Sequence, residues 1–124
     1  MKTSYTRLFA DEAGESHFEE IGVELPSVDF APPAPLVNLS SFLPATQLAF
    51  FGAPGNWQGD WHPSSGRNFF VLVSGEWEIE ASDGTVKRFV AKDVLLAEDT
   101  HGKGHKSHVS SATESLAIVV QLES

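Results

Sequence analysis

The sequence predicts an all-β protein, built as an antiparallel sandwich or barrel. Short runs of strand-forming residues, separated by turn residues, fill the chain from Thr46 onward. No window carries the apolar stripe of an amphipathic helix, so we expect no helices that could cover a parallel sheet. The predicted strands span residues 46–52, 67–73, 76–82, 85–90, 93–97 and 115–122.

The first 45 residues predict a proline-rich, extended N-terminal arm that packs along the barrel or across a neighbouring subunit. This stretch holds five of the seven prolines, and proline fixes φ and lacks a backbone donor. We expect one short strand there at best, over residues 18–25. The chain is therefore divided into an arm, residues 1–45, and a β-barrel domain, residues 46–124.

Two of the predicted strands indicate which faces are packed. Apolar and charged residues alternate over residues 76–81, which places Trp77, Ile79 and Ala81 on a buried face and three glutamates on a solvent-exposed one. The Asp-Gly pair that follows suits a tight hairpin turn. Residues 69–73 are apolar on both faces, as expected of a central strand that is covered on each side.

Composition excludes several classes of function. The 17 acidic and 8 basic residues give a formal net charge of −9, and the bases are scattered, so we expect neither nucleic acid nor a membrane surface as a partner. Without cysteine there is no disulfide, no Cys-ligated metal and no thiol nucleophile. The chain has no secretory signal pattern and no run of about 20 apolar residues, so we expect a cytoplasmic protein.

Two stretches carry the residues most suited to chemistry. The first, residues 60–76, holds a histidine, a turn, the two-sided apolar strand and a Ser-Gly-Glu turn. The second, residues 92–105, holds an aspartate turn and a strand, and it ends in Gly102-Lys103-Gly104-His105. The pattern leaves open whether Trp57 and Trp61 pack in the interior or line an opening.

In this order, the two stretches resemble the two motifs of the cupin family. The family's first motif is His-any-His, three or four residues, Glu, six residues, Gly. Counting back from Gly75 places Asn68 at the glutamate position and Ser64 and His62 at the two histidine positions. His105 matches the end of the second motif. The resemblance implies a small jelly-roll barrel or sandwich, cupin-like, over residues 46–122.

The resemblance also implies that His62 and His105 meet in the barrel and hold a divalent metal ion. Since catalytic metal sites usually have three protein ligands, His101 is the candidate for the third. Glu98 or Asp99 could instead supply a carboxylate from the same loop. We expect Asn68 to orient a substrate or a water, which gives His62, Asn68 and His105 as candidate catalytic residues.

Two functional hypotheses follow. The first is an enzyme that uses a divalent metal ion (iron, manganese, nickel or zinc) to act on a small polar organic molecule in isomerase, lyase or oxygenase chemistry. The second is a non-catalytic small-ligand-binding or sensing module that has lost its metal. In both cases we expect a homodimer, because open sheet edges and an extended arm invite pairing between chains.

Overall fold

The computed structural model describes residues 1–123, and all of its regular elements in that range are strands. No helix long and apolar enough to cross a membrane occurs among these residues. Because every regular element of the described residues is a strand, the all-β prediction is confirmed. The strands are β1 (Lys2–Ala10), β2 (Ser16–Glu24), β3 (Ser27–Val28), β4 (Val37–Asn38), β5 (Ala45–Ala53), β6 (Asn68–Ser74), β7 (Trp77–Ala81), β8 (Val86–Phe89), β9 (Val94–Ala97), β10 (His105–Val109) and β11 (Ser115–Leu122).

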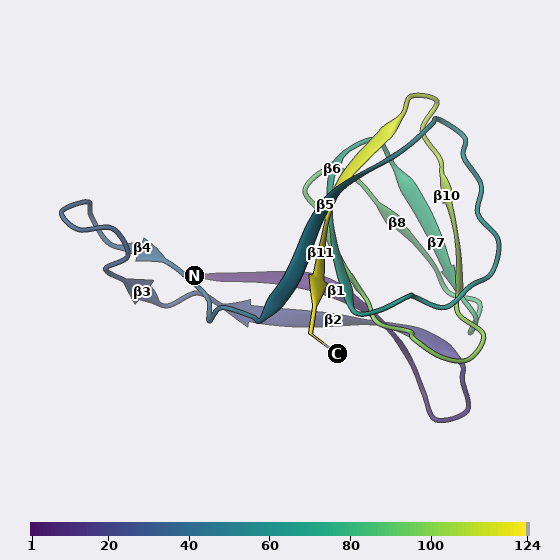
Figure 1. Ribbon diagram of the computed structural model, residues 1–124, viewed down its shortest axis with the longest axis horizontal. Coiled ribbons are helices and arrows are strands. Elements are labelled where there is room, and N and C mark those ends of the chain that lie inside the picture. Colours follow the sequence, from purple (N-terminus) through teal and green to yellow (C-terminus); the bar gives the residue numbers. More distant parts are fainter. Residues whose placement is uncertain (124) are drawn as a thin grey trace.

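Two sheets face one another and enclose the interior (Figure 1). The larger sheet has the strand order β2-β1-β9-β6-β11-β5, and the smaller has the order β10-β7-β8. Neighbouring strands run antiparallel, as predicted, except that β1 and β9 are parallel. Buried side chains from both sheets form one core between them, including Leu72 and Leu95 from the larger sheet and Ile79 and Val109 from the smaller.

The alternation read from the sequence is confirmed in β7. Trp77, Ile79 and Ala81 are buried, and a tight turn at Asp83-Gly84 leads into β8. Gly84 has a φ of 92°, a value that favours glycine. The two-sided strand β6 lies inside the larger sheet between β9 and β11, so its central position is also confirmed. The expectation that it is covered on each side is wrong at its C-terminal end, where the outward Val73 is exposed.

The expectation of at most one short strand near residues 18–25 is wrong. β1 and β2 form a long hairpin, and β1 also pairs with β9 on its other side. A strand paired on both sides gains its backbone hydrogen bonds whatever its side chains are, so it tolerates the polar inward Thr6 beside the fully buried Leu8. The proline-rich part of the predicted arm, residues 26–44, projects from the barrel and carries the small β3-β4 hairpin (Figure 1).

The turn between β1 and β2 is tied to the smaller sheet by a histidine. The two ring nitrogens of His17 lie 2.7 Å from an Asp11 carboxylate oxygen and 2.9 Å from an Asp83 carboxylate oxygen. Hydrogen bonds from Asp11 and then Asp83 raise the pKa of His17 above its usual value. The His17 imidazole therefore links the β1-β2 turn to the β7-β8 turn through one contact at each ring nitrogen.

Candidate functional site

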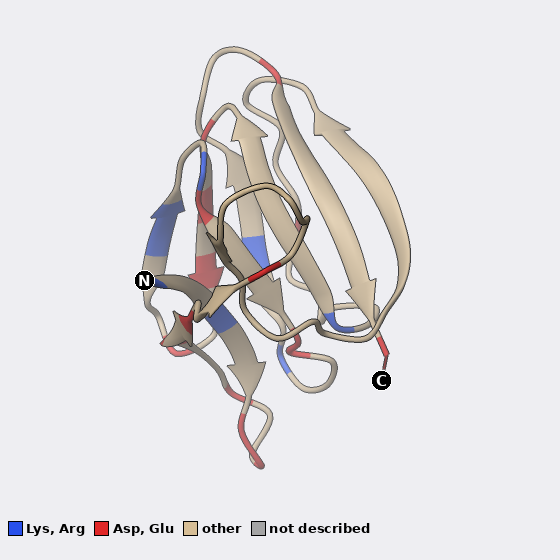
Figure 2. Cartoon of the chain, turned by 90° about the vertical axis from the view of Figure 1, so that its left-hand side faces the viewer, with Lys and Arg blue, Asp and Glu red and all other residues tan. Residues whose placement is uncertain are grey.

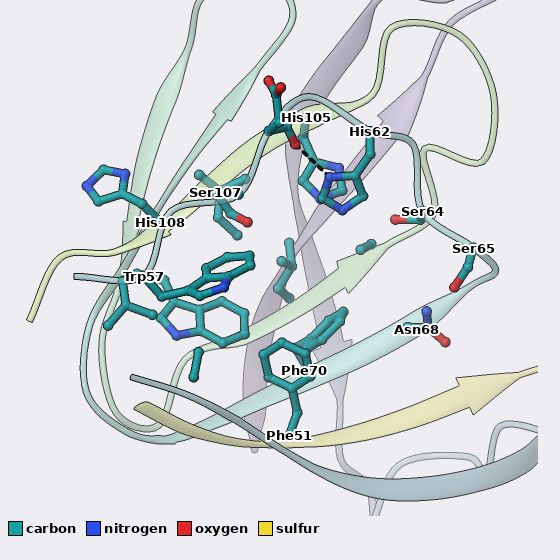
Figure 3. A pocket seen from close by; sticks show the side chains of 18 of the residues that line it. Phe51, Trp57, His62, Ser64, Ser65, Asn68, Phe70, His105, Ser107 and His108 are labelled. Atoms are coloured by element: carbon teal, nitrogen blue, oxygen red, sulfur yellow. Dashed lines mark hydrogen bonds between the residues drawn. The ribbon is translucent and has the colours of Figure 1, made fainter. Parts of the chain in front are cut away.

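A cavity of about 460 Å³ opens between the two sheets and is the candidate site (Figure 3). Its apolar wall is a mutual cluster of Phe51, Phe70 and Trp77, whose ring centroids lie 5.6–5.9 Å apart in edge-to-face arrangements. These rings come from β5, β6 and β7, so both sheets contribute. The indole N–H of Trp77 donates to Ser115 Oγ at 2.5 Å, which fixes the tryptophan in the wall.

The segment between β5 and β6 crosses the mouth of this cavity and carries His62. It runs beside β10 as an added antiparallel strand, with backbone bridges that join Gln58 to His108 and His62 to His105. The amides of His62 and His105 each donate to the other's carbonyl oxygen at 3.0 Å. Trp57, at the start of the segment, lines the cavity, whereas Trp61 is outside the lining.

Gly104 makes this close approach sterically feasible. Its φ is 74°, and a Cβ at this position would lie 2.2 Å from the carbonyl carbon of His62. Backbone atoms cannot yield to such a contact, so any side chain would push the segment away from β10. The glycine immediately before His105 is thus what brings the two histidines together.

The rings of His62 and His105 lie side by side, with centroids 4.8 Å apart, at the top of the cavity in Figure 3. His62 Nδ1 lies 2.7 Å from the Asp60 carbonyl oxygen, and His105 Nδ1 lies 2.7 Å from Asp99 Oδ2. Both oxygens can only accept, so each Nδ1 donates, and in the neutral ring each Nε2 keeps a free lone pair. The predicted meeting of two distant histidines is present, and each ring offers an acceptor.

Asp99 is wholly buried and does not line the cavity. Besides holding His105, its carboxylate accepts a hydrogen bond of 2.8 Å from Ser64 Oγ. Its backbone oxygen accepts the Ser64 amide at 3.0 Å. Asp99 is therefore a positioning residue that fixes the His105 ring and the segment between β5 and β6, and it is not the inward carboxylate donor that the sequence suggested.

His101 lies apart from the other two histidines. Its Nε2 contacts the Asp11 carbonyl oxygen at 3.1 Å, its side chain is exposed, and it does not line the cavity. The loop packs against the β1-β2 turn, where Lys103 N donates to Gly14 O at 2.9 Å. This packing turns His101 outward, so the predicted set of three histidines is not assembled.

Glu98 is also directed away from the cavity. Its carboxylate is shared between Arg7 and Arg67, with Arg67 Nε at 2.8 Å. Burial alone would raise its pKa, but the hydrogen bonds from Arg7 and Arg67 outweigh burial and lower the pKa of Glu98. Asn68, in contrast, does line the cavity, at the start of β6 beside Ser65 and below the histidines (Figure 3).

The two motif stretches therefore come together as the resemblance implies. His62 precedes β6, Gly75 turns the chain from β6 into β7 with a φ of 84°, and His105 opens β10 opposite His62. Two facing sheets enclose the site they share. The chain has a cupin-like fold.

Comparisons with solved structures give distant likenesses. Neither protein-family models nor curated proteins match the chain. Among solved structures, the cupin domain of Cnp3 from Schizosaccharomyces pombe is similar at 15% identity and a TM-score of 0.48, over 98% of this chain and 84% of that one. An ethanolamine utilization protein Q from Salmonella typhimurium gives 12% and 0.42, over 98% and 97%. Protein NMB1881 from Neisseria meningitidis gives 13% and 0.44, over 61% and 74%.

The donors of this cupin-like cavity do not fit a resident divalent metal ion. No group of three or more His, Asp or Glu side chains that could hold a metal occurs within residues 1–123. His62 and His105 supply two nitrogens, and the carboxylates that could complete a set are engaged elsewhere. Catalytic sites normally need a third protein ligand.

Proposed function

We propose that the protein is a small-ligand-binding cupin-like module, whose cavity holds an organic molecule with an apolar body and a hydrogen-bond-donating head group. The head group is a hydroxyl, an amine or a protonated acid that donates to the Nε2 atoms of His62 and His105. The observation that carries the proposal is the pair of imidazoles whose Nδ1 atoms are both occupied, by the Asp60 carbonyl and the Asp99 carboxylate, while their Nε2 atoms have no hydrogen-bond partner among the described residues.

The size and walls of the cavity support this class of ligand. A volume of about 460 Å³ lies within the range of small-molecule sites, roughly 300–1,000 Å³. The cluster of Phe51, Phe70 and Trp77 offers an apolar surface to the body of the ligand, while Asn68 and Ser65 add polar groups on another side. A few polar groups in a mostly apolar cavity are typical of sites that fix one orientation of a ligand.

The competing proposal is the metal-dependent enzyme of isomerase, lyase or oxygenase type. It is supported by the way each histidine is held, because metal-ligating histidines usually donate their other ring nitrogen to a carboxylate or a carbonyl oxygen. It is weakened by the lack of a third donor among the described side chains. Iron, manganese, nickel and zinc are the metals to be sought.

Metal analysis of protein purified without an affinity tag separates the two proposals. The binding module predicts no stoichiometric metal and no change of thermal midpoint on adding these ions. A near-stoichiometric metal that is lost in His62→Ala and His105→Ala would support the enzyme instead. His101→Ala is the matched control, because this exposed ring lies outside the cavity and its loss should change neither result.

A thermal-shift screen of small alcohols, amines and carboxylic acids then tests binding. A ligand present at 100 times its Kd stabilises the folded state by about 2.7 kcal/mol, and stabilisation of this kind is the expected result for a hit. Binding should weaken at least about tenfold in His105→Ala and stay unchanged in His101→Ala. Turnover of a hit would reject the non-catalytic version of the proposal.

A further inference from the structure

The lining of the cavity between the two sheets offers no counter-charge to an anion. Among the described residues that line it, none is a lysine or an arginine. Lys106 stands between His105 and Ser107 on β10, but those two face the cavity, and Lys106 is exposed on the other side of the strand. Arg67 is bonded to Glu98, which is directed away from the cavity. A carboxylate or phosphate ligand would therefore meet neither of these cations.

Negative charge, in contrast, lies close to the histidine pair. The carboxylate of Asp99 is wholly buried behind His105, and no lysine or arginine of the described residues forms an ion pair with it. A carboxylate removed from water is usually paired with a cation. Asp60, on the segment across the mouth, adds an exposed carboxylate to the lining. Figure 2 shows the Lys and Arg positions scattered along the chain, and the net charge of −9 favours a cationic ligand for the whole protein.

Aromatic rings line much of the same space. The planes of Phe51, Phe70 and Trp77 are inclined at 61–89° to one another, so the three rings meet as the walls of a corner and are not stacked. The face of an aromatic ring attracts a cation that lies within about 6 Å of its centroid, and tryptophan does so most strongly. These walls therefore suit an organic cation as well as an apolar body.

Trp57 brings a further indole toward the histidine end of the cavity. Its carbonyl oxygen accepts the Val109 amide at 2.8 Å, which holds the residue beside β10. The far edge of its ring reaches back over Gly59, where a Cβ would lie 2.7 Å from the ring atom Cη2. Because Gly59 is two residues nearer to His62 along the segment, the missing side chain leaves room for the indole to lie toward the histidines. Figure 3 shows the Trp57 ring pointing into the cavity below them.

We propose that the ligand of this cavity is an organic ammonium ion, a primary or secondary amine in its charged form with an apolar body. This inference rests on the proposed function, in which the head group is a hydroxyl, an amine or a protonated acid. An ammonium group of this kind has at least two N–H donors, so it can donate to the Nε2 atoms of His62 and His105 together. A hydroxyl has one donor and can satisfy only one ring. The charge of the ammonium then lies one imidazole away from the Asp99 carboxylate and against the face of Trp57.

Isothermal titration calorimetry with three probes of similar shape tests the head group. Phenethylamine, 2-phenylethanol and phenylacetate share a benzyl group and differ in the charge that they carry at neutral pH. We expect phenethylamine to bind at least about tenfold more tightly than 2-phenylethanol, and phenylacetate to bind most weakly. Phenethyltrimethylammonium is charged but has no N–H, so it should bind more weakly than phenethylamine.

Two variants separate charge recognition from shape. Asp99→Asn keeps an oxygen for His105 but removes the charge, so phenethylamine should lose affinity at least about fivefold while 2-phenylethanol changes less than about twofold. Trp57→Leu removes the indole face and should lower the affinity for the amine in the same selective way. Trp61→Leu is the matched control, because Trp61 is 42% exposed and lies outside the lining, and it should change neither affinity. Circular dichroism of each variant establishes that the fold is retained.

The outcomes for the inference and for the proposed function differ. A preference for phenethylamine that is lost in Asp99→Asn and Trp57→Leu and kept in Trp61→Leu supports the inference. Equal binding of phenethylamine and 2-phenylethanol to the wild type would overturn it and leave the proposed function intact, and so would a preference that survives in both variants. Tightest binding of phenylacetate, which has no donor, would overturn both. Binding of none of the three probes at about 10 mM would reject the proposed function and the inference with it.

Discussion

Substitution of Asp99 tests whether the His105 ring is held from behind. Asp99→Leu keeps a side chain of similar shape but removes both carboxylate oxygens. The Ser64 hydroxyl and the His105 Nδ1 proton then lose the acceptors that they reach at 2.8 and 2.7 Å. Asp99→Asn retains an oxygen and an amide group, so both neighbours keep a neutral partner.

The structure sets the size of each effect. A buried donor left without a partner costs about 1–3 kcal/mol, so Asp99→Leu, with two such donors, should destabilise the protein by about 2–6 kcal/mol. Asp99→Asn exchanges charge-assisted hydrogen bonds for neutral ones and should cost about 1 kcal/mol. For a chain of 124 residues, each kcal/mol corresponds to a shift in Tm of about 3–5 °C.

Urea denaturation measures these differences, and long-range ¹H–¹⁵N spectra of the histidine rings report which nitrogen of His105 carries the proton. We expect the proton on Nδ1 in the wild type and a loss of that preference in Asp99→Leu. Asp60→Asn is the control: Asp60 is exposed, and an asparagine can still accept from the Trp61 amide, so stability should change by less than about 0.5 kcal/mol. Equal stabilities of Asp99→Leu and Asp99→Asn would refute the positioning role.

Three further predictions concern Gly104, Ser115 and His17. Gly104→Ala should destabilise the protein by about 1–3 kcal/mol, as measured by urea denaturation, because its Cβ would displace His62. For the same reason it should weaken ligand binding at least about tenfold. Retained affinity would show that the histidine pair is not needed for binding. Ser115→Ala should cost about 1–3 kcal/mol by leaving the Trp77 indole N–H unpaired, as measured by fluorescence-monitored unfolding, and a smaller loss would indicate that water replaces the hydroxyl. The contribution of His17 should be complete below pH 6.5 and lost as pH rises through its raised pKa, so the gap in Tm between wild type and His17→Gln should close toward pH 9. A gap that widens with pH would contradict the assignment of a raised pKa.

Most of the barrel could be predicted because its strands differ from their surroundings in a simple way. The alternation over residues 76–81 and the apolar run over 69–73 each match one strand of the structure, with ends displaced by a residue or so. β1 and β2 were missed because their pattern is not apolar. Their stability comes from pairing on the sheet and from polar links, such as Arg7 with Glu98, which only the three-dimensional arrangement brings together.

The site could be predicted in part for a similar reason. The resemblance of the two stretches to the cupin motifs implied that His62 lies beside His105, and Gly104 allows the two chain segments to touch. Spacing could not tell which way the loop before β10 faces. That direction is set by contact with the β1-β2 turn, which the sequence did not reveal, and this contact directs His101 outward.

The role of Asp99 has the widest consequence for function. A metal site places its carboxylates toward the cavity, where they meet the ion, while the groups that orient its histidines lie behind them. Here the buried carboxylate lies behind His105 and is occupied by Ser64 and by that histidine. Ser64 stands at a position where the cupin pattern has a histidine, and its short side chain bonds to Asp99 in place of reaching a metal. With serine at this position the cavity has one inward donor fewer than the cupin pattern would give it, and the Ser64–Asp99 hydrogen bond supports the His105 ring. Both features agree with the proposed cavity that binds its ligand through imidazole acceptors.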